Sequence, residues 1–169
     1  MPGRIELLLM RHGEAEDWAE GGDAQRQLTA RGRTMAVRVG AMLRAAGLAP
    51  TIAISSPFVR AKQTMDGVLE AAGAPLATQT EPRLVPGTPA AIAVTALADA
   101  AGDAASARIL AVGHNPCVTS MLTRMVGDGS RTSFAVSTGD VAHLAFDPTR
   151  GTAVLLGYIP ARILEALAQ

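Results

Sequence analysis

The chain has 169 residues, with 15 basic against 15 acidic side chains, 49% hydrophobic residues and 3% aromatic residues. This length favours a single domain over residues 1–169 with one sizeable core. The balanced charge argues against nucleic acid as a partner, so any phosphate would have to be bound locally. No stretch approaches the roughly 20 apolar residues that cross a bilayer, and the amino-terminal apolar run is too short for a secretory signal. We therefore expect a cytoplasmic protein without a membrane partner.

Apolar runs alternate with stretches of helical periodicity along the chain. Ile5 to Met10 contains one carboxylate in an otherwise apolar run, which is typical of a strand buried on both faces. Capping residues before the helices and glycines after them mark the boundaries. In chain order the sequence predicts strands at 5–10, 51–55, 76–81 and 108–112, a hairpin at 141–146 and 153–158, helices from Thr29 to Gly47, Pro57 to Gly73, Thr88 to Gly102 and Pro116 to Val126, and a helical turn or two at 161–168. This alternation gives an α/β fold with a mainly parallel sheet and an antiparallel edge.

Three strand-to-helix junctions carry groups that suit phosphate chemistry. They read Arg11-His12-Gly13, then Ser56-Pro57-Phe58-Val59-Arg60, then Gly113-His114-Asn115-Pro116. Because the carboxyl ends of parallel strands meet at one edge of a sheet, we expect these junctions to surround one crevice. The three-part pattern resembles the histidine phosphatase superfamily, and it is most similar to the short SixA-type phosphohistidine phosphatases. The resemblance extends from Ile5 to about Pro160.

The resemblance implies a phosphoglycerate mutase-like, three-layer α/β/α sandwich. It also implies a phosphate pocket, without metal or other cofactor, built from four catalytic side chains: His12, Arg11, Arg60 and His114. A neutral His12 imidazole would attack phosphorus and form a phosphoenzyme that water hydrolyses. Arg11 and Arg60 would hold the phosphoryl oxygens with guanidinium forks, and His114 would bind the same oxygens. Gly13 and Asn115 are expected to add contacts to the phosphate.

One family residue is missing, and its absence bears on the substrate. In mutase-like branches a glutamate after the third strand is the general acid, whereas the segment here reads Arg83-Leu84-Val85-Pro86-Gly87 and the nearest carboxylate, Glu81, comes too early. The family's asparagine after the first motif is also missing, with Trp18 near its place. Phosphohistidine leaves as imidazole and needs less proton donation than an alkoxide. The sequence therefore favours a phosphohistidine-bearing protein domain as substrate. A small-molecule phosphomonoesterase and a phosphate-binding module without turnover remain the alternatives.

Other polar residues are interpreted as structural. Cys117 fits a small helix residue that packs inward, and His143 lies in an alternating strand as a structural or surface residue. The carboxylates between Glu14 and Glu20 lack histidine at ligand spacing and predict an acidic rim rather than a metal site. The segment 55–57 is typical of a helix entrance. The polar loop at 21–27 is expected beside the pocket.

Overall fold

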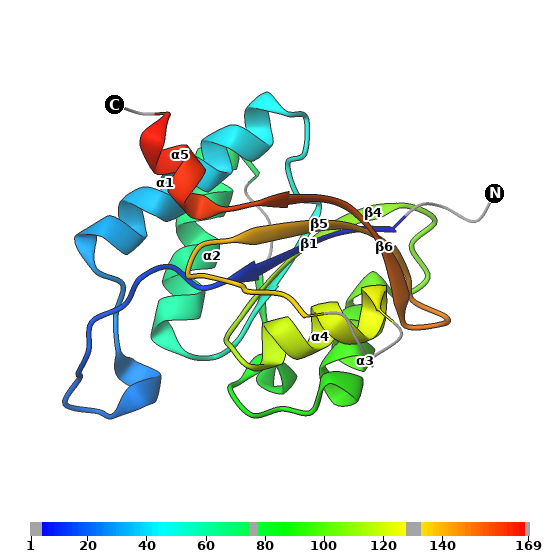
Figure 1. Cartoon of the computed structure of the whole chain (residues 1–169), viewed down its shortest axis with the longest axis horizontal. Helices are drawn as coiled ribbons and strands as arrows, with labels where there is room; N and C mark the ends of the chain where they lie inside the picture. Colours follow the sequence, from blue (N-terminus) through cyan, green and yellow to red (C-terminus); the bar gives the residue numbers. More distant parts are fainter. Residues whose placement is uncertain (1–4, 75–77, 128–132, 168–169) are drawn as a thin grey trace.

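The computed structural model describes residues 5–74, 78–127 and 133–167. Within these residues six strands form a sheet in the order β3-β2-β4-β1-β5-β6, with helices on both of its faces (Figure 1). The strands are β1 (Ile5–Arg11), β2 (Ile52–Ser55), β3 (Thr78–Thr80), β4 (Ala107–Gly113), β5 (Val141–Asp147) and β6 (Thr152–Ile159). The helices are α1 (Ala30–Ala45), α2 (Val59–Ala72), α3 (Ala90–Ala101), α4 (Cys117–Val126) and α5 (Ala161–Ala166), with 3-10 turns η1 (Asp23–Gln25) and η2 (Pro82–Leu84).

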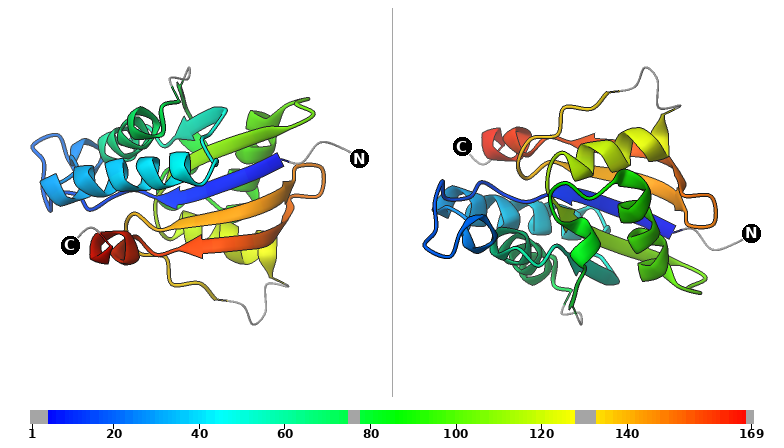
Figure 2. Two further views of the ribbon diagram at one scale, coloured as in Figure 1. Left: turned by 90° about the horizontal axis from the view of Figure 1, so that it is seen from above. Right: turned by 90° about the horizontal axis from the view of Figure 1, so that it is seen from below.

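The predicted fold class is confirmed. Strands β3, β2, β4 and β1 pair in parallel, whereas β5 pairs with β1, and β6 with β5, in antiparallel fashion. Helices α1, α2 and α5 cover one face of the sheet, and α3 and α4 cover the other (Figure 2). The result is a three-layer α/β/α sandwich with an antiparallel edge. None of the helices within the described ranges is long and apolar enough to traverse a bilayer.

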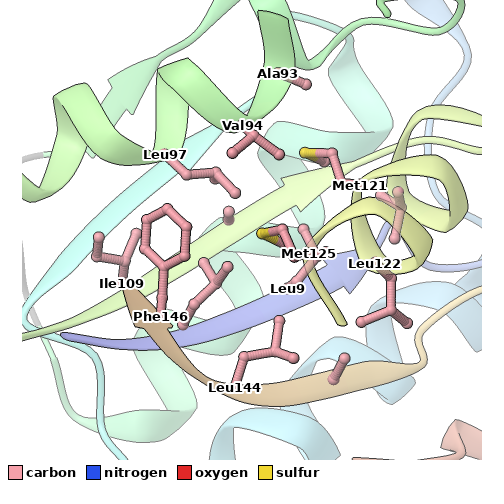
Figure 3. Packing of buried hydrophobic residues seen from close by; sticks show 14 of the residues in the cluster. Leu9, Ala93, Val94, Leu97, Ile109, Met121, Leu122, Met125, Leu144 and Phe146 are labelled. Carbon is pink, nitrogen blue, oxygen red and sulfur yellow. The ribbon is translucent and has the colours of Figure 1, made fainter. Parts of the chain in front are cut away.

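Strand β1 shows why its sequence is apolar on both faces. Leu7 and Leu9 belong to the buried cluster beneath α3 and α4, and Figure 3 shows Leu9 in this cluster with Leu97 and Met121. Leu8 and Met10 point to the opposite cluster under α1 and α2. Successive strand residues alternate between faces, so a central strand that is covered on both sides needs apolar residues at nearly every position.

Most predicted helix boundaries are confirmed, and three starts are corrected. Helix α4 begins at Cys117 rather than at Pro116, which is its N-cap. Thr29 caps α1 by accepting a hydrogen bond from the Gly32 amide, and Gly73 ends α2 in the left-handed region that glycine tolerates. Helix α2 begins at Val59 rather than at Pro57, because Phe58 still has extended backbone angles. Helix α3 is preceded by Pro89 as its N-cap, not by Thr88, since Pro89 has an extended ψ and precedes the first helical turn.

Two predicted elements lie partly outside the described residues. The strand expected at 76–81 is observed as the short, exposed edge strand β3, and residues 75–77 are not described. The helical turns expected at 161–168 are observed as α5 over Ala161–Ala166, and residue 168 is not described.

The topology brings three strand ends together. Strands β2, β4 and β1 are neighbours in the sheet and run in the same direction, so their carboxyl ends lie side by side. The backbone continues this ladder beyond the strands, because the Ser56 amide donates to the Val112 carbonyl and the His12 amide donates to the Gly113 carbonyl, both at 3.0 Å. After β1 the chain passes closely over the first turn of α1. A Cβ atom at Gly32 would collide with the Glu14 carbonyl, which explains the glycine.

Candidate active site

All four side chains predicted to be catalytic line one cavity of about 370 Å³. It opens at the carboxyl ends of β1, β4 and β2. Two of its walls come from the loop that joins β1 to α1 and from the segment before β5. The lining residues are Arg11, His12, Glu14, Ala15, Asp23, Arg26, Arg60, Pro86, His114, Asn115 and Thr138.

His12 follows β1 directly and presents one ring nitrogen to the cavity. Its Nδ1 lies 2.7 Å from the Gly13 carbonyl oxygen, which can only accept, so Nδ1 carries the proton. The other nitrogen, Nε2, therefore has a free electron pair, and it accepts a hydrogen bond from Arg60 Nε at 3.2 Å. The backbone contact thus fixes the imidazole in the tautomer that a nitrogen nucleophile needs.

Burial keeps His12 uncharged. Its side chain is 8% exposed, and desolvation, reinforced by the nearby cations Arg60, Arg11 and Arg26, lowers its pKa to about 4. The hydrogen bond to Gly13 opposes this shift without cancelling it. At neutral pH the imidazole is consequently neutral, with the Nε2 electron pair available for attack or for binding a donor.

Arg60 is held from the second position of α2 and is almost fully buried, at 4% exposed. Its Nε donates to His12, while Nη1 donates to the Asp23 carbonyl at 2.6 Å and Nη2 to the Asp23 carboxylate at 3.0 Å. The guanidinium also lies 5.0 Å from the centroid of the Phe58 ring. Every side of the Arg60 fork is therefore engaged by the protein, and an incoming oxyanion has to displace Asp23 to reach it.

Arg11 and His114 each keep one buried nitrogen without a partner. Arg11 donates from Nη1 to the Val136 carbonyl at 2.9 Å, and His114 Nε2 lies 2.8 Å from the Ser56 hydroxyl. Within the described parts of the chain, Arg11 Nε and His114 Nδ1 have no hydrogen-bond partner. Burial lowers the pKa of Arg11, and burial together with the neighbouring His12 and Arg60 side chains lowers the pKa of His114 to about 3. Unsatisfied buried nitrogens are uncommon and costly, and their presence on two residues that line the same cavity favours a ligand site there.

Gly13 and Asn115 differ in their relation to the cavity. Gly13 does not line it, and its amide donates to Thr64 Oγ1 at 3.0 Å while its carbonyl accepts from His12. Gly13 therefore orients the His12 ring, and its contact with a phosphate stays a prediction. Asn115 lines the cavity, but its side chain donates to the Val136 carbonyl and accepts from Thr119. The bond to Val136 links the loop after β4 to the segment before β5, whose Val136 carbonyl also accepts a hydrogen bond from Arg11.

The sequence did not single out Asp23 or Arg26 as site residues. Both come from the polar loop expected beside the pocket, and Arg26 Nη1 donates to the Asp23 carboxylate at 2.8 Å. The two arginines hold the pKa of Asp23 below its ordinary value, although burial opposes this. A polar loop next to a buried arginine was the available signal, but the sequence alone does not say which loop residue reaches the arginine.

The residues interpreted as structural take up such positions. Glu81 caps η2 and pairs with Arg83 outside the cavity, and His143 contacts Glu6 at 3.3 Å. Cys117 is 1% exposed, and burial raises the pKa of its thiol to about 11. The rim residues after Glu14 are exposed. Over the described ranges, no group of three or more His, Cys, Asp or Glu side chains is arranged to hold a metal ion.

Comparison with known proteins supports the resemblance that the motifs carry. The family model described as the histidine phosphatase superfamily (branch 1) matches residues 7–85, which include the first two motifs. None of the curated proteins matches this chain.

Solved structures with the same fold cover nearly the whole chain. The protein histidine phosphatase SixA, complexed with tungstate, is 22% identical, with a TM-score of 0.83 over 95% of this chain and 99% of that chain. Phosphoglycerate mutase from Bacillus anthracis is 15% identical, with a TM-score of 0.74 over 99% and 98% of the two chains. A phosphoserine phosphatase variant from Entamoeba histolytica, complexed with phosphoserine, is 16% identical, with a TM-score of 0.68 over 94% and 98%. At these identities the likeness establishes a phosphoglycerate mutase-like fold.

Proposed function

Because the resemblance to the histidine phosphatase superfamily is confirmed by a family model over residues 7–85, we propose that this protein is a phosphatase that hydrolyses phosphohistidine on another protein. The proposal rests above all on His12. Its imidazole is neutral with an unprotonated Nε2, and it lines a cavity together with Arg11, Arg60 and His114. An anion-binding site needs cations, but it does not need a buried neutral imidazole among them.

In the first step the phosphoryl group moves from the substrate to His12. The substrate oxyanion displaces Asp23 and draws the Arg60 guanidinium onto its oxygens, which frees the His12 Nε2 electron pair. Nε2 then bonds to phosphorus while the phosphorus–nitrogen bond of the substrate breaks. The substrate imidazole, which carries a proton on its other ring nitrogen, departs as the neutral ring. Arg11 and Arg60 neutralise the charge on the transferring oxygens, and neutral His114 is placed to add a hydrogen bond, so this route requires positioned charge more than it requires a metal.

In the second step water attacks the phosphorus on His12. The bond from phosphorus to Nε2 breaks, inorganic phosphate leaves, and the neutral imidazole is restored. The hydrogen bond from His12 Nδ1 to the Gly13 carbonyl, present before the reaction, also suits the phosphorylated ring, because Nδ1 keeps its proton throughout.

The carboxylates at the cavity favour a nitrogen leaving group. Asp23 is paired with two arginines that lower its pKa, so it is ionised at neutral pH and has no proton to give. Glu14 accepts hydrogen bonds from the Thr29 hydroxyl and from Arg31, so both of its side-chain oxygens are already engaged. An alkoxide would leave poorly from such a site, whereas an imidazole leaves with little help.

The direct test compares two substrates at equal concentration: a phosphohistidine phosphotransfer domain and a simple aryl phosphate. We expect phosphate release from the protein substrate at the higher kcat/KM. Faster hydrolysis of phosphate esters such as phosphoserine, a ligand of one protein with this fold, would instead indicate a small-molecule phosphomonoesterase. Binding of phosphate without turnover of either class would indicate a binding module.

A further inference from the structure

Ser56 is a buried hydroxyl that the sequence marked only as part of a helix entrance. It follows β2 directly, has no solvent exposure, and lies 2.8 Å from His114 Nε2. Its Oγ also accepts a hydrogen bond from the Phe58 amide at 3.3 Å. The same oxygen therefore contacts the backbone that leads into α2 and the imidazole that follows β4.

The protons around Ser56 can be counted. The Phe58 amide must donate, so the Ser56 oxygen is an acceptor in that contact. The hydroxyl proton then needs an acceptor of its own, and among the described residues its hydrogen-bonded neighbour is His114 Nε2. If the hydroxyl donates there, Nε2 is unprotonated and Nδ1 carries the proton of the neutral ring.

The opposite tautomer leaves two groups unsatisfied. With the proton on Nε2, the buried Ser56 hydroxyl would lose its acceptor. The bare electron pair of Nδ1 would be a second buried group without a partner, and it would repel an oxyanion bound beside it. An unmade hydrogen bond at a buried group costs about 1 to 3 kcal/mol, so the arrangement with the proton on Nδ1 is favoured.

We propose that Ser56 is a positioning residue that fixes His114 as its Nδ1–H tautomer, so that the unpartnered Nδ1 donates to a phosphoryl oxygen. This inference rests on the proposed function and deepens it, because it identifies His114 Nδ1–H as a hydrogen-bond donor to the phosphoryl group in addition to Arg11 and Arg60. Phe58 supports the same geometry, since its ring meets the His114 ring edge-on with centroids 5.0 Å apart.

The first test uses the substrate-free protein and needs no activity. Histidines labelled with nitrogen-15 give imidazole correlation spectra that distinguish the two neutral tautomers, and the chain has only three histidines. A His114→Gln variant assigns the signals. At neutral pH we expect His114 with its proton on Nδ1. A wild-type His114 protonated on Nε2 would overturn the proposal, whether or not the protein is a phosphatase.

The second test removes the hydroxyl. Ser56→Ala is expected to populate the Nε2–H tautomer of His114, to lower kcat roughly tenfold, and to weaken binding of inorganic phosphate. Ser55→Ala is the matched control, because Ser55 is equally buried but donates to the Ser56 carbonyl and not to His114. It should leave the tautomer unchanged.

An unchanged His114 tautomer in Ser56→Ala would overturn the positioning role. If neither the variant nor the wild type turns over substrate but the predicted tautomer is present, the result would contradict the proposed phosphatase activity. The assignment of the proton to His114 Nδ1 would still hold. Ser56→Thr retains the hydroxyl and should keep the wild-type tautomer.

Discussion

The two ends of β1 both carry charged residues, and they differ in how those charges are satisfied. At the amino end, Glu6 accepts hydrogen bonds from Arg108 at 2.8 Å and from His143 at 3.3 Å. Arg108 also donates to the Ala49 carbonyl. The bond from Arg108 is the main reason why the pKa of Glu6 is lowered.

At the carboxyl end the charges are not fully matched. Arg11 Nε and His114 Nδ1 lack partners within the described residues, and Asp23 is shared between Arg60 and Arg26. The difference separates a structural cluster from a site that is complete only with a ligand. We define the first as the paired cluster, made of Glu6, Arg108 and His143, and the second as the open site, made of Arg11, His12, Arg60 and His114.

The largest contrast is expected between the histidines of the two regions. His12→Ala should abolish turnover because it removes the nucleophile, while circular dichroism shows a folded protein. His143→Ala in the paired cluster should keep the wild-type kcat. Measurable turnover by His12→Ala on the same substrate would exclude His12 as nucleophile.

The arginines of the two regions give the next contrast. Arg60→Ala should lower kcat about 100- to 1,000-fold, since one fixed charged donor to a transition state contributes about 2.7 to 4 kcal/mol. Arg108→Ala removes the same charge from the paired cluster and should leave kcat within twofold, although the protein will unfold at a lower denaturant concentration. Equal effects on kcat would remove the distinction between the regions.

The pH dependence of stability should come largely from the open site. Below the ordinary histidine pKa of 6.5, these two histidines bind protons in the unfolded chain. In the native protein His12 and His114 stay neutral, since their pKa values are about 4 and about 3. The free energy of unfolding should therefore fall by about 2 kcal/mol for each histidine between pH 7 and pH 5. Urea unfolding at pH 7 and at pH 5 measures this difference in the free energy of unfolding.

A double variant, His12→Gln with His114→Gln, should remove most of this dependence, and His143→Gln should keep it. If the free energy of unfolding of the wild type does not change between pH 7 and pH 5, the burial of two neutral histidines is contradicted.

The smallest expected effect concerns Asp23, which engages Arg60 in the absence of substrate. Asp23→Asn removes the competing charge and should tighten binding of inorganic phosphate severalfold by calorimetry, since an exposed ion pair contributes about 0.2 to 1 kcal/mol. Asp17→Asn changes the net charge equally from an exposed position in the same loop. Weaker phosphate binding in Asp23→Asn than in Asp17→Asn would mean that Asp23 orients Arg60 instead of competing for it.

Strand order explains why the four side chains of the open site could be predicted from sequence. His12, Arg60 and His114 follow apolar strands, and parallel neighbours align their carboxyl ends. The contact between the Gly13 amide and Thr64 could not be predicted, because it joins residues 51 positions apart through the packing of α2 against the first loop. The same holds for Asp23, since the path of a polar loop leaves no periodic signal.

The first residues of the helices show a second limit of prediction from sequence. The sequence predicts Thr29 as a helix cap, because threonine side chains accept hydrogen bonds from backbone amides in the first turn. In the structure Thr29 accepts such a bond from the Gly32 amide. The sequence places Pro57 and Pro89 inside helices because proline suits the first turn, but both precede the helix. Pro89 keeps an extended ψ, because proline fixes φ and leaves ψ free. Local chemistry thus identifies the helix but not its first residue.

The most direct measurement is to trap the phosphoenzyme. A phosphohistidine substrate with a radioactive phosphoryl group, quenched rapidly in base, should leave label on the protein that is stable to base and labile to acid. Peptide mapping should place it on Nε2 of His12, and none should remain in His12→Ala. Label on His114, or the same label in His12→Ala, would contradict the account.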